Sequence, residues 1–206
     1  GYSLDGWTFK GWSKIKGGEI DYAPDSVLNN LTATANGVYT LYAVWEANTY
    51  TVKYDFNKPA NASGNVMGDT EDSIHVYDTE RKLSANGYSL VGWTFKGWAE
   101  TAIGAIKYAD GENVINLTMT ANGTYTLYAV WEANVYNISF DTAGGSYIDP
   151  ISVIYDSEIT KTAGLPVRKG YNFNGYFTGR DGAGAKYFNA DGTANNVVYK
   201  TVGGTV

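Results

Sequence analysis

Cysteine is absent from the 206-residue chain, which excludes disulfide bridges, thiolate metal sites and cysteine nucleophiles. Proline (4) and histidine (1) are scarce. No apolar run approaches the roughly 18 residues of a membrane-spanning helix, so we expect no membrane insertion in this segment. Basic clusters are lacking too, and the net charge of −6 argues against nucleic acid as a partner, because phosphate binding needs patches of Lys and Arg.

Tyr (18), Gly (25) and Trp (6) are abundant instead. Aromatic and β-branched runs alternate with turns of Gly, Asn and Asp, a pattern typical of β-rich units. Aliphatic residues are fewer, so we expect each core to depend on aromatic side chains, which bury large areas.

One stretch of the chain occurs twice. Leu-Tyr-Ala-Val-Trp-Glu-Ala-Asn at 41–48 returns unchanged at 127–134. Its surroundings match as well, because 1–48 aligns without a gap to 87–134 and is identical at 32 of 48 positions. Such a repeat indicates tandem structural units.

The alignment predicts three units, which we name repeat one, repeat two and repeat three. Repeat one (1–48) is the C-terminal half of a unit, repeat two (49–134) is complete, and repeat three (135–206) lacks its last strand. A unit of roughly 75–90 residues can just support its own core.

The repeated stretch has the period of a strand. That period places Leu127, Ala129 and Trp131 on one face, with Trp131 as an anchor in the core, and Thr126 and Tyr128 on the other. Asn-Gly shortly before each copy predicts a turn, because both residues tolerate positive φ.

The rest of a complete unit is predicted from repeat two. Strands are expected at 50–56 and 73–77, and alternation directs Tyr50, Val52, Tyr54 and Phe56 to one side of the first strand. Short helices are expected at 79–85 and, in repeat three, at 157–163. A small sheet packed on one helix is an α+β, β-rich fold.

The Gly-Trp-Thr-Phe-Lys-Gly-Trp stretch at 92–98 is a further strand candidate. In a regular strand, Trp93 and Phe95 face away from Trp98. One set then belongs to the core, and the other packs between units or forms a platform for sugar rings. Packing is the favoured reading. The candidate interaction residues are Trp12, Trp98, Tyr42 and Tyr128.

Three motifs resemble the Listeria–Bacteroides repeat, also called the internalin B-repeat. They are Phe-Asp-Thr-Ala-Gly-Gly at 140–145, Gly-Tyr-Asn-Phe-Asn-Gly-Tyr at 170–176 and the Leu-Tyr-Ala-Val-Trp ending at 127–131. The resemblance covers essentially the whole chain, although Tyr176 stands where the family favours Trp. It implies tandem β-grasp-like (ubiquitin-like) units in bacterial surface or secreted proteins, acting as stalk or adhesion repeats.

Catalytic chemistry is not indicated. His75 lies in a predicted strand without a Ser, Asp or metal partner, so we interpret it as an ordinary strand residue. Asp69, Glu71 and Asp72 are better explained by a solvated loop than by a calcium site. The Gly pairs lack the Lys and helix of a phosphate loop. We therefore expect no enzyme, no metal and no cofactor.

Three functions remain open. The first is a non-enzymatic module of a bacterial cell-surface or cell-wall protein, a stalk, spacer or adhesin segment whose partners are neighbouring repeats. The second is a filament subunit, since repeat one supplies what repeat three lacks and a copy of the chain is then the partner; a fragment of a longer array explains the same pattern. The third binds a glycan or host protein through exposed Trp and Tyr. All three predict an extracellular location, at the bacterial surface or secreted.

Overall fold

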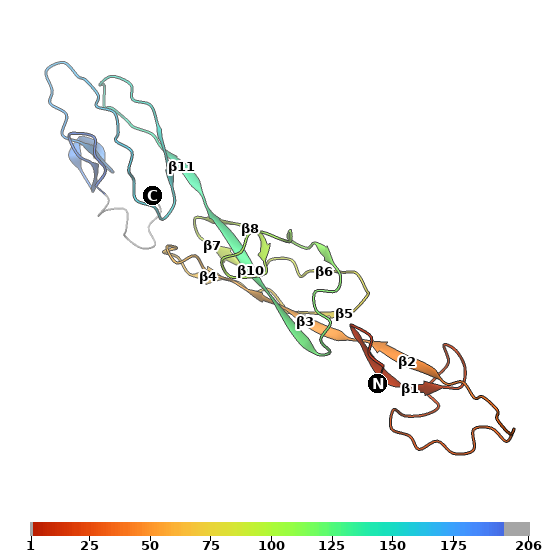
Figure 1. Ribbon diagram of the computed structural model, residues 1–206. Helices are drawn as coiled ribbons and strands as arrows, with labels where there is room; N and C mark the ends of the chain where they lie inside the picture. The colour runs from red at the N-terminus through yellow and green to blue at the C-terminus, as the bar shows by residue number, and fades with distance from the viewer. Residues whose placement is uncertain (1, 196–206) are drawn as a thin grey trace. The chain divides into compact units, whose positions relative to one another are not determined.

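The computed structural model describes residues 2–195 and is built almost wholly from strands (Figure 1). The only helical element in this part of the chain is the short 3-10 turn η1 (Arg180–Gly182). The strands are β1 (Trp7–Ser13), β2 (Tyr42–Ala47), β3 (Thr49–Asp55), β4 (Val66–Met67), β5 (Ser73–Val76), β6 (Arg81–Lys82), β7 (Ser89–Leu90), β8 (Trp93–Ala99), β9 (Asn113–Val114), β10 (Gly123–Ala133), β11 (Val135–Ile138), β12 (Ile151–Ile154), β13 (Tyr176–Phe177) and β14 (Lys186–Phe188). The β-rich prediction is confirmed.

The chain divides into two compact units, each assembled from separate segments. The first comprises Gly1–Asp55, Asp69–Gly87 and Trp98–Tyr128. The second comprises Phe56–Gly68, Tyr88–Gly97 and Ala129–Val206, and is described as far as residue 195.

Strand β3 is the centre of the first unit. It pairs in parallel with β10 and antiparallel with β5 (Figure 1). Tyr50 and Val52 are buried as predicted, and so are Leu127 and Ala129 of β10. Period-two alternation therefore predicted these faces correctly. Phe56, just past β3, is about half exposed (49%) instead of inward.

The β1–β2 pair of the first unit contains a β-bulge. Phe9 pairs with Trp45 and Gly11 with Val44, so Lys10 is an extra residue on β1. Gly11 has φ 147°, and a Cβ there would lie 2.4 Å from the Tyr22 carbonyl oxygen, so glycine is required.

The corresponding Gly97 has φ 143°, and burial in β8 no longer alternates beyond it. Gly97, Trp98 and Ala99 are all buried in succession. Regular alternation over 92–98, which would place Gly97 and Trp98 on opposite faces with only one of them buried, is therefore not kept at this glycine.

The second unit contains two antiparallel pairs from repeat three, β11–β12 and β13–β14. Its core joins Val153, Ile159, Ala163 and Phe188. β7 and β8 as far as Gly97 also lie in this unit, with Leu90 opposite Trp93. The segment 196–206, where repeat three is predicted to lack its closing strand, lies outside the described residues.

Both helix predictions are wrong. The 79–85 segment is extended: β6 pairs with β9, and the buried Leu83 donates its amide to the Glu112 carbonyl. The 157–163 segment is irregular, with Ile159 and Ala163 in the core. Seven residues are too few for a helix to be stable by itself, so tertiary partners decide the conformation.

Candidate functional site

The four predicted interaction residues lie in different environments. Trp98 is fully buried (0% exposed), with its ring 4.9 Å from that of Tyr54, so its ring contributes to the core. Trp12, at the same repeat position, is half-buried against the rings of Tyr2 and Phe9, at 6.0 and 5.1 Å.

The two tyrosines of this set lie on strands β2 and β10. Tyr42 is 36% exposed and lies on β2 opposite Ser13. Tyr128 is half-buried and lies on β10 opposite Asp55. The described contacts do not gather the four rings into one surface, and ligand binding by them stays a prediction.

A site that the sequence did not predict lies where one repeat meets the next. In the first unit, the amide of Asn48 donates to the Gly6 carbonyl at 2.8 Å, and the amide of Tyr77 donates to the Asn48 carbonyl at 2.8 Å. Asn48 is the last residue of repeat one, and Tyr77 belongs to repeat two. The first bond therefore fixes Asn48 within repeat one, and the second connects Asn48 to repeat two.

Side chains reinforce this contact. Trp7 Nε1 donates to Asp78 Oδ2 at 3.1 Å, and Thr8 Oγ1 donates to Asn48 Oδ1 at 2.5 Å. Asp78 has φ 58°, a conformation that Asp adopts more readily than most residues. We name this set, Gly6, Trp7, Thr8, Asn48, Tyr77 and Asp78, the first joint.

The second unit contains the same set between repeats two and three. We name it the second joint; its residues are Gly92, Trp93, Thr94, Asn134, Tyr155 and Asp156. The two backbone bonds measure 2.8 and 2.9 Å, the tryptophan–aspartate bond 2.9 Å and the threonine–asparagine bond 2.6 Å. Four hydrogen bonds thus recur within 0.2 Å, which makes the joint a repeated feature of the chain.

Glycine is required in both joints. Gly6 and Gly92 have φ of 74° and 77°. A Cβ would lie 2.3 Å from the ring of Tyr77 in the first case and 2.1 Å from the ring of Tyr155 in the second. Any side chain would displace the tyrosine and adopt a strained backbone.

Asp156 accepts three hydrogen bonds with its side chain. It accepts hydrogen bonds from Ser63 N (2.9 Å), Ser63 Oγ (2.5 Å) and Trp93 Nε1 (2.9 Å). Burial alone would raise the pKa of this carboxyl, but these bonds outweigh burial and lower it. The carboxylate therefore stays ionised where it holds the joint.

Two short motifs in the sequence mark the joint, although strand periodicity alone does not reveal them. Gly-Trp-Thr recurs at 6–8 and 92–94, and Tyr-Asp recurs at 77–78 and 155–156. Each pair repeats with the unit, yet nothing in the one-dimensional pattern says that the two motifs meet across a repeat boundary.

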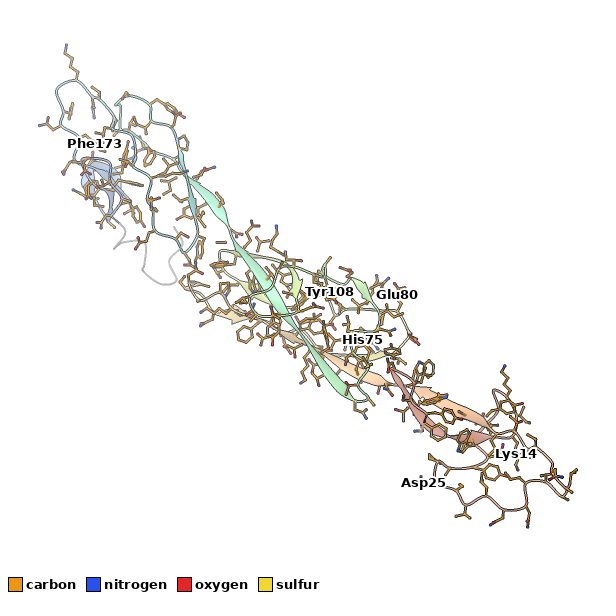
Figure 2. All side chains as sticks on the ribbon, viewed as in Figure 1. Lys14, Asp25, His75, Glu80, Tyr108 and Phe173 are labelled. Carbon is orange, nitrogen blue, oxygen red and sulfur yellow. The ribbon has the colours of Figure 1, made fainter. Side chains whose placement is uncertain are left out.

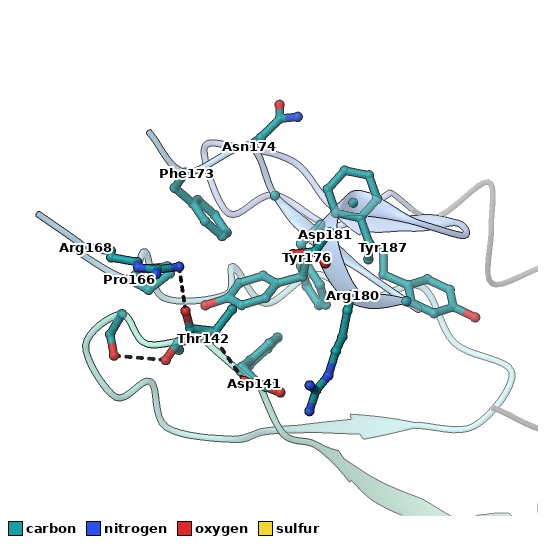
Figure 3. Close-up of a pocket in the computed structure, with 18 of the residues that line it drawn as sticks. Asp141, Thr142, Pro166, Arg168, Phe173, Asn174, Tyr176, Arg180, Asp181 and Tyr187 are labelled. Carbon is teal, nitrogen blue, oxygen red and sulfur yellow. Dashed lines mark hydrogen bonds between the residues drawn. The ribbon is translucent and has the colours of Figure 1, made fainter. Parts of the chain in front are cut away.

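A cavity of about 750 Å3 lies within repeat three (Figure 3). Its floor includes the Tyr176 ring, 4.4 Å from Phe140 and 4.8 Å from Phe173. Arg168 lies 4.0 Å above the Tyr171 ring. Aromatic rings, charged groups and amide groups line this cavity together.

The surroundings of His75 are those of a residue with a structural role (Figure 2). It is fully buried, stacks on Tyr50 at 5.5 Å, and its Nε2 lies 2.9 Å from Ser73 Oγ. Burial, then the nearby charge of Arg81, lowers its pKa. Among residues 2–195, no three His, Cys, Asp or Glu side chains are placed to hold a metal.

The comparison with known families supports the sequence motifs. Residues 136–200 match the model of the Listeria-Bacteroides repeat domain. The resemblance predicted from the motifs is thereby confirmed for this part of repeat three. No solved structure matches the chain.

Two proteins of Evansella cellulosilytica are similar over most of the chain. One is provisionally named Gly-rich membrane protein and is 30% identical over 174 residues, which is 84% of this chain. The other is provisionally named membrane protein and is 30% identical over 176 residues, also 84% of this chain. The chain spans only 18% and 23% of these relatives. Within the described part of the chain, no helix has the length and apolarity needed to cross a membrane.

Proposed function

We propose that the chain is part of a non-enzymatic bacterial surface protein and acts as a stalk or spacer. The observation that carries this function is the duplicated joint, because a spacer needs the same defined contact between each repeat and the next. The repeat family and the names of the relatives support a surface location.

Surface display tests the spacer function. One or two copies of the full chain are inserted between a cell-wall anchor and an epitope tag, and antibody binding to intact cells is measured. We expect tag accessibility to rise with copy number and to exceed that given by a flexible Gly/Ser linker of equal residue count, whose mean span grows only as the square root of its length. Equal accessibility with the linker would rule out a spacer role.

Binding of a sugar-containing ligand is a second candidate, favoured by the cavity in repeat three. Its volume of about 750 Å3 lies within the usual range for ligand sites. Tyr171 is 65% exposed beneath Arg168 and offers a ring face for stacking.

A glycan array tests this candidate with the parent chain, Tyr171→Ala and the control Tyr147→Ala. Tyr147 is 77% exposed and does not line the cavity. Binding that is lost in Tyr171→Ala and kept in Tyr147→Ala supports the site. No binding by the parent chain removes it.

A further inference from the structure

Each joint is formed by an edge and a turn from successive repeats. The edge is Gly-Trp-Thr of one repeat with the Asn that follows its closing strand. The turn is the Tyr-Asp pair at the end of the next repeat's second strand, β5 or β12. In both joints the tryptophan donates to the aspartate and the tyrosine ring lies against the glycine.

Repeat three has a corresponding stretch, Gly170-Tyr171-Asn172, in which Asn172 takes the place of the threonine. Gly170 has φ 81°, close to the 74° and 77° of Gly6 and Gly92, and Tyr171 takes the place of the tryptophan. No described atom lies within 4 Å of a Cβ built on Gly170. Gly170 therefore adopts a positive φ although no tyrosine ring packs against it. The conformation of this glycine is set by its own stretch of chain and does not depend on a partner turn.

Hydrogen bonds also hold the edge and the turn together. In the second joint, three bonds to the Asp156 side chain and the backbone bond from the Tyr155 amide to the Asn134 carbonyl cross from repeat two to repeat three. An edge that loses its turn leaves these groups to water, and a turn that loses its edge does the same. Opening on either side thus weakens the other.

We propose that the Gly-Trp-Thr edge is a recognition surface for the Tyr-Asp turn of the following repeat, and that this contact couples local unfolding across the repeat boundary. This coupling rests on the proposed function, since the repeats are taken as successive units of an array. It specifies the partner chemically: a repeat whose second strand ends in Tyr-Asp, with Asp in the left-handed region.

Native-state hydrogen exchange of the full chain tests the coupling with Gly92→Ala. The substitution lies in repeat two, and the readout is the amides of β11 and β12 in repeat three. We expect their protection to fall about tenfold or more, because the displaced Tyr155 no longer holds its turn.

Gly170→Ala is the matched control. It introduces the same positive-φ strain, within repeat three itself, without a ring to displace. Protection of β11 and β12 should change little. An equal loss in both variants, or a loss in Gly92→Ala confined to 88–97, would overturn the coupling.

Asp156→Asn tests the reverse direction and serves if Gly92→Ala does not fold. A coupling free energy is reciprocal, so a change in repeat three must lower protection at 88–97 in repeat two. The control is Asp191→Asn, whose carboxylate accepts from the amide and hydroxyl of Thr193 within repeat three.

Unchanged protection at 88–97 in Asp156→Asn, with folding intact, contradicts the coupling. The result of the surface-display experiment does not depend on this outcome. Repeats can be coupled without acting as a spacer, and a spacer can be built from uncoupled repeats.

Discussion

Trp12 and Trp98 occupy one position of the repeat and differ in environment. Trp98 is fully buried against Tyr54 of β3, whereas Trp12 is half-buried. We expect Trp98→Ala to lower the free energy of unfolding by about 3–5 kcal/mol and Trp12→Ala to lower it by much less. Chemical denaturation followed by far-ultraviolet circular dichroism measures both. A larger loss for Trp12→Ala would contradict the burial difference.

His75 gives the chain a pH-dependent stability. Its pKa is lowered on folding, so below the ordinary value of 6.5 the unfolded chain takes up a proton that the folded chain does not. The free energy of unfolding should therefore fall as the pH decreases from 7 to 5.5. The measurement is denaturant unfolding at both pH values.

His75→Gln provides the control for this titration. Its stability should change less between pH 7 and 5.5, because glutamine does not titrate. The carboxyl of Asp156, whose pKa is lowered below 3.8, contributes stability that is lost only at more acidic pH. A parallel pH dependence in wild type and His75→Gln would assign the effect to other groups.

Sequence reasoning succeeded for residues whose environment is set by their own strand. The inward side chains of β3 follow from alternation, and so do Leu127 and Ala129. Trp131 was expected in the core, yet it is half-buried, with Nε1 donating to the Phe56 carbonyl at 2.8 Å. The indole keeps one polar atom near the surface, a requirement that apolar periodicity does not express.

At the level of elements, glycines decide where the strands depart from regularity. Gly11 and Gly175 have φ of 147° and 114°, and a Cβ on either would lie within 2.4 Å of a carbonyl oxygen. Sequence alternation assumes that no residue is inserted, so it cannot locate such a bulge.

Gly175→Ala tests this requirement, with Gly182→Ala as the control. Both glycines have positive φ, but only Gly175 faces a backbone atom, the Phe188 carbonyl oxygen at 2.3 Å from the Cβ position. We expect Gly182→Ala to cost about 1–2 kcal/mol. Gly175→Ala should cost on the order of 3 kcal/mol, because backbone must also move. Equal costs in thermal unfolding would argue against the close approach.

The helix predictions failed for a different physical reason. Leu83 is buried from an extended segment, and Ile159 and Ala163 are buried from an irregular one. Caps and apolar spacing favour a helix only weakly over seven residues. The joint escaped prediction because its edge and turn lie far apart in the sequence and meet only when successive repeats have folded.

At the scale of the whole molecule, charge controls solubility. The isoelectric point is near 4.7 and the net charge at pH 7 is −6. We expect the chain to aggregate near pH 4.7, where repulsion between molecules vanishes, and to redissolve at pH 7. Static light scattering across this range measures it, and constant scattering from pH 7 to 4.7 would contradict the expectation.

The same measurement examines self-assembly, which stays a prediction. Growth in mass with concentration at pH 7, where the charge opposes association, is expected if one chain completes the repeat of another. Growth that occurs only near pH 4.7 reflects neutralised charge. A monomer at every concentration at pH 7 contradicts the filament.

The turns that precede the closing strands also influence how the molecule ages. Asn36 and Asn122 are each followed by glycine, the neighbour that best permits the asparagine side chain to cyclise and deamidate. That reaction needs the glycine nitrogen as nucleophile, yet the amides of Gly37 and Gly123 donate to the carbonyls of Thr34 and Thr120 at 3.0 Å. In the folded turn, these hydrogen bonds hold the glycine nitrogen and keep it from attacking the asparagine side chain. The amount of isoaspartate at these two positions would therefore measure how long each turn has spent open.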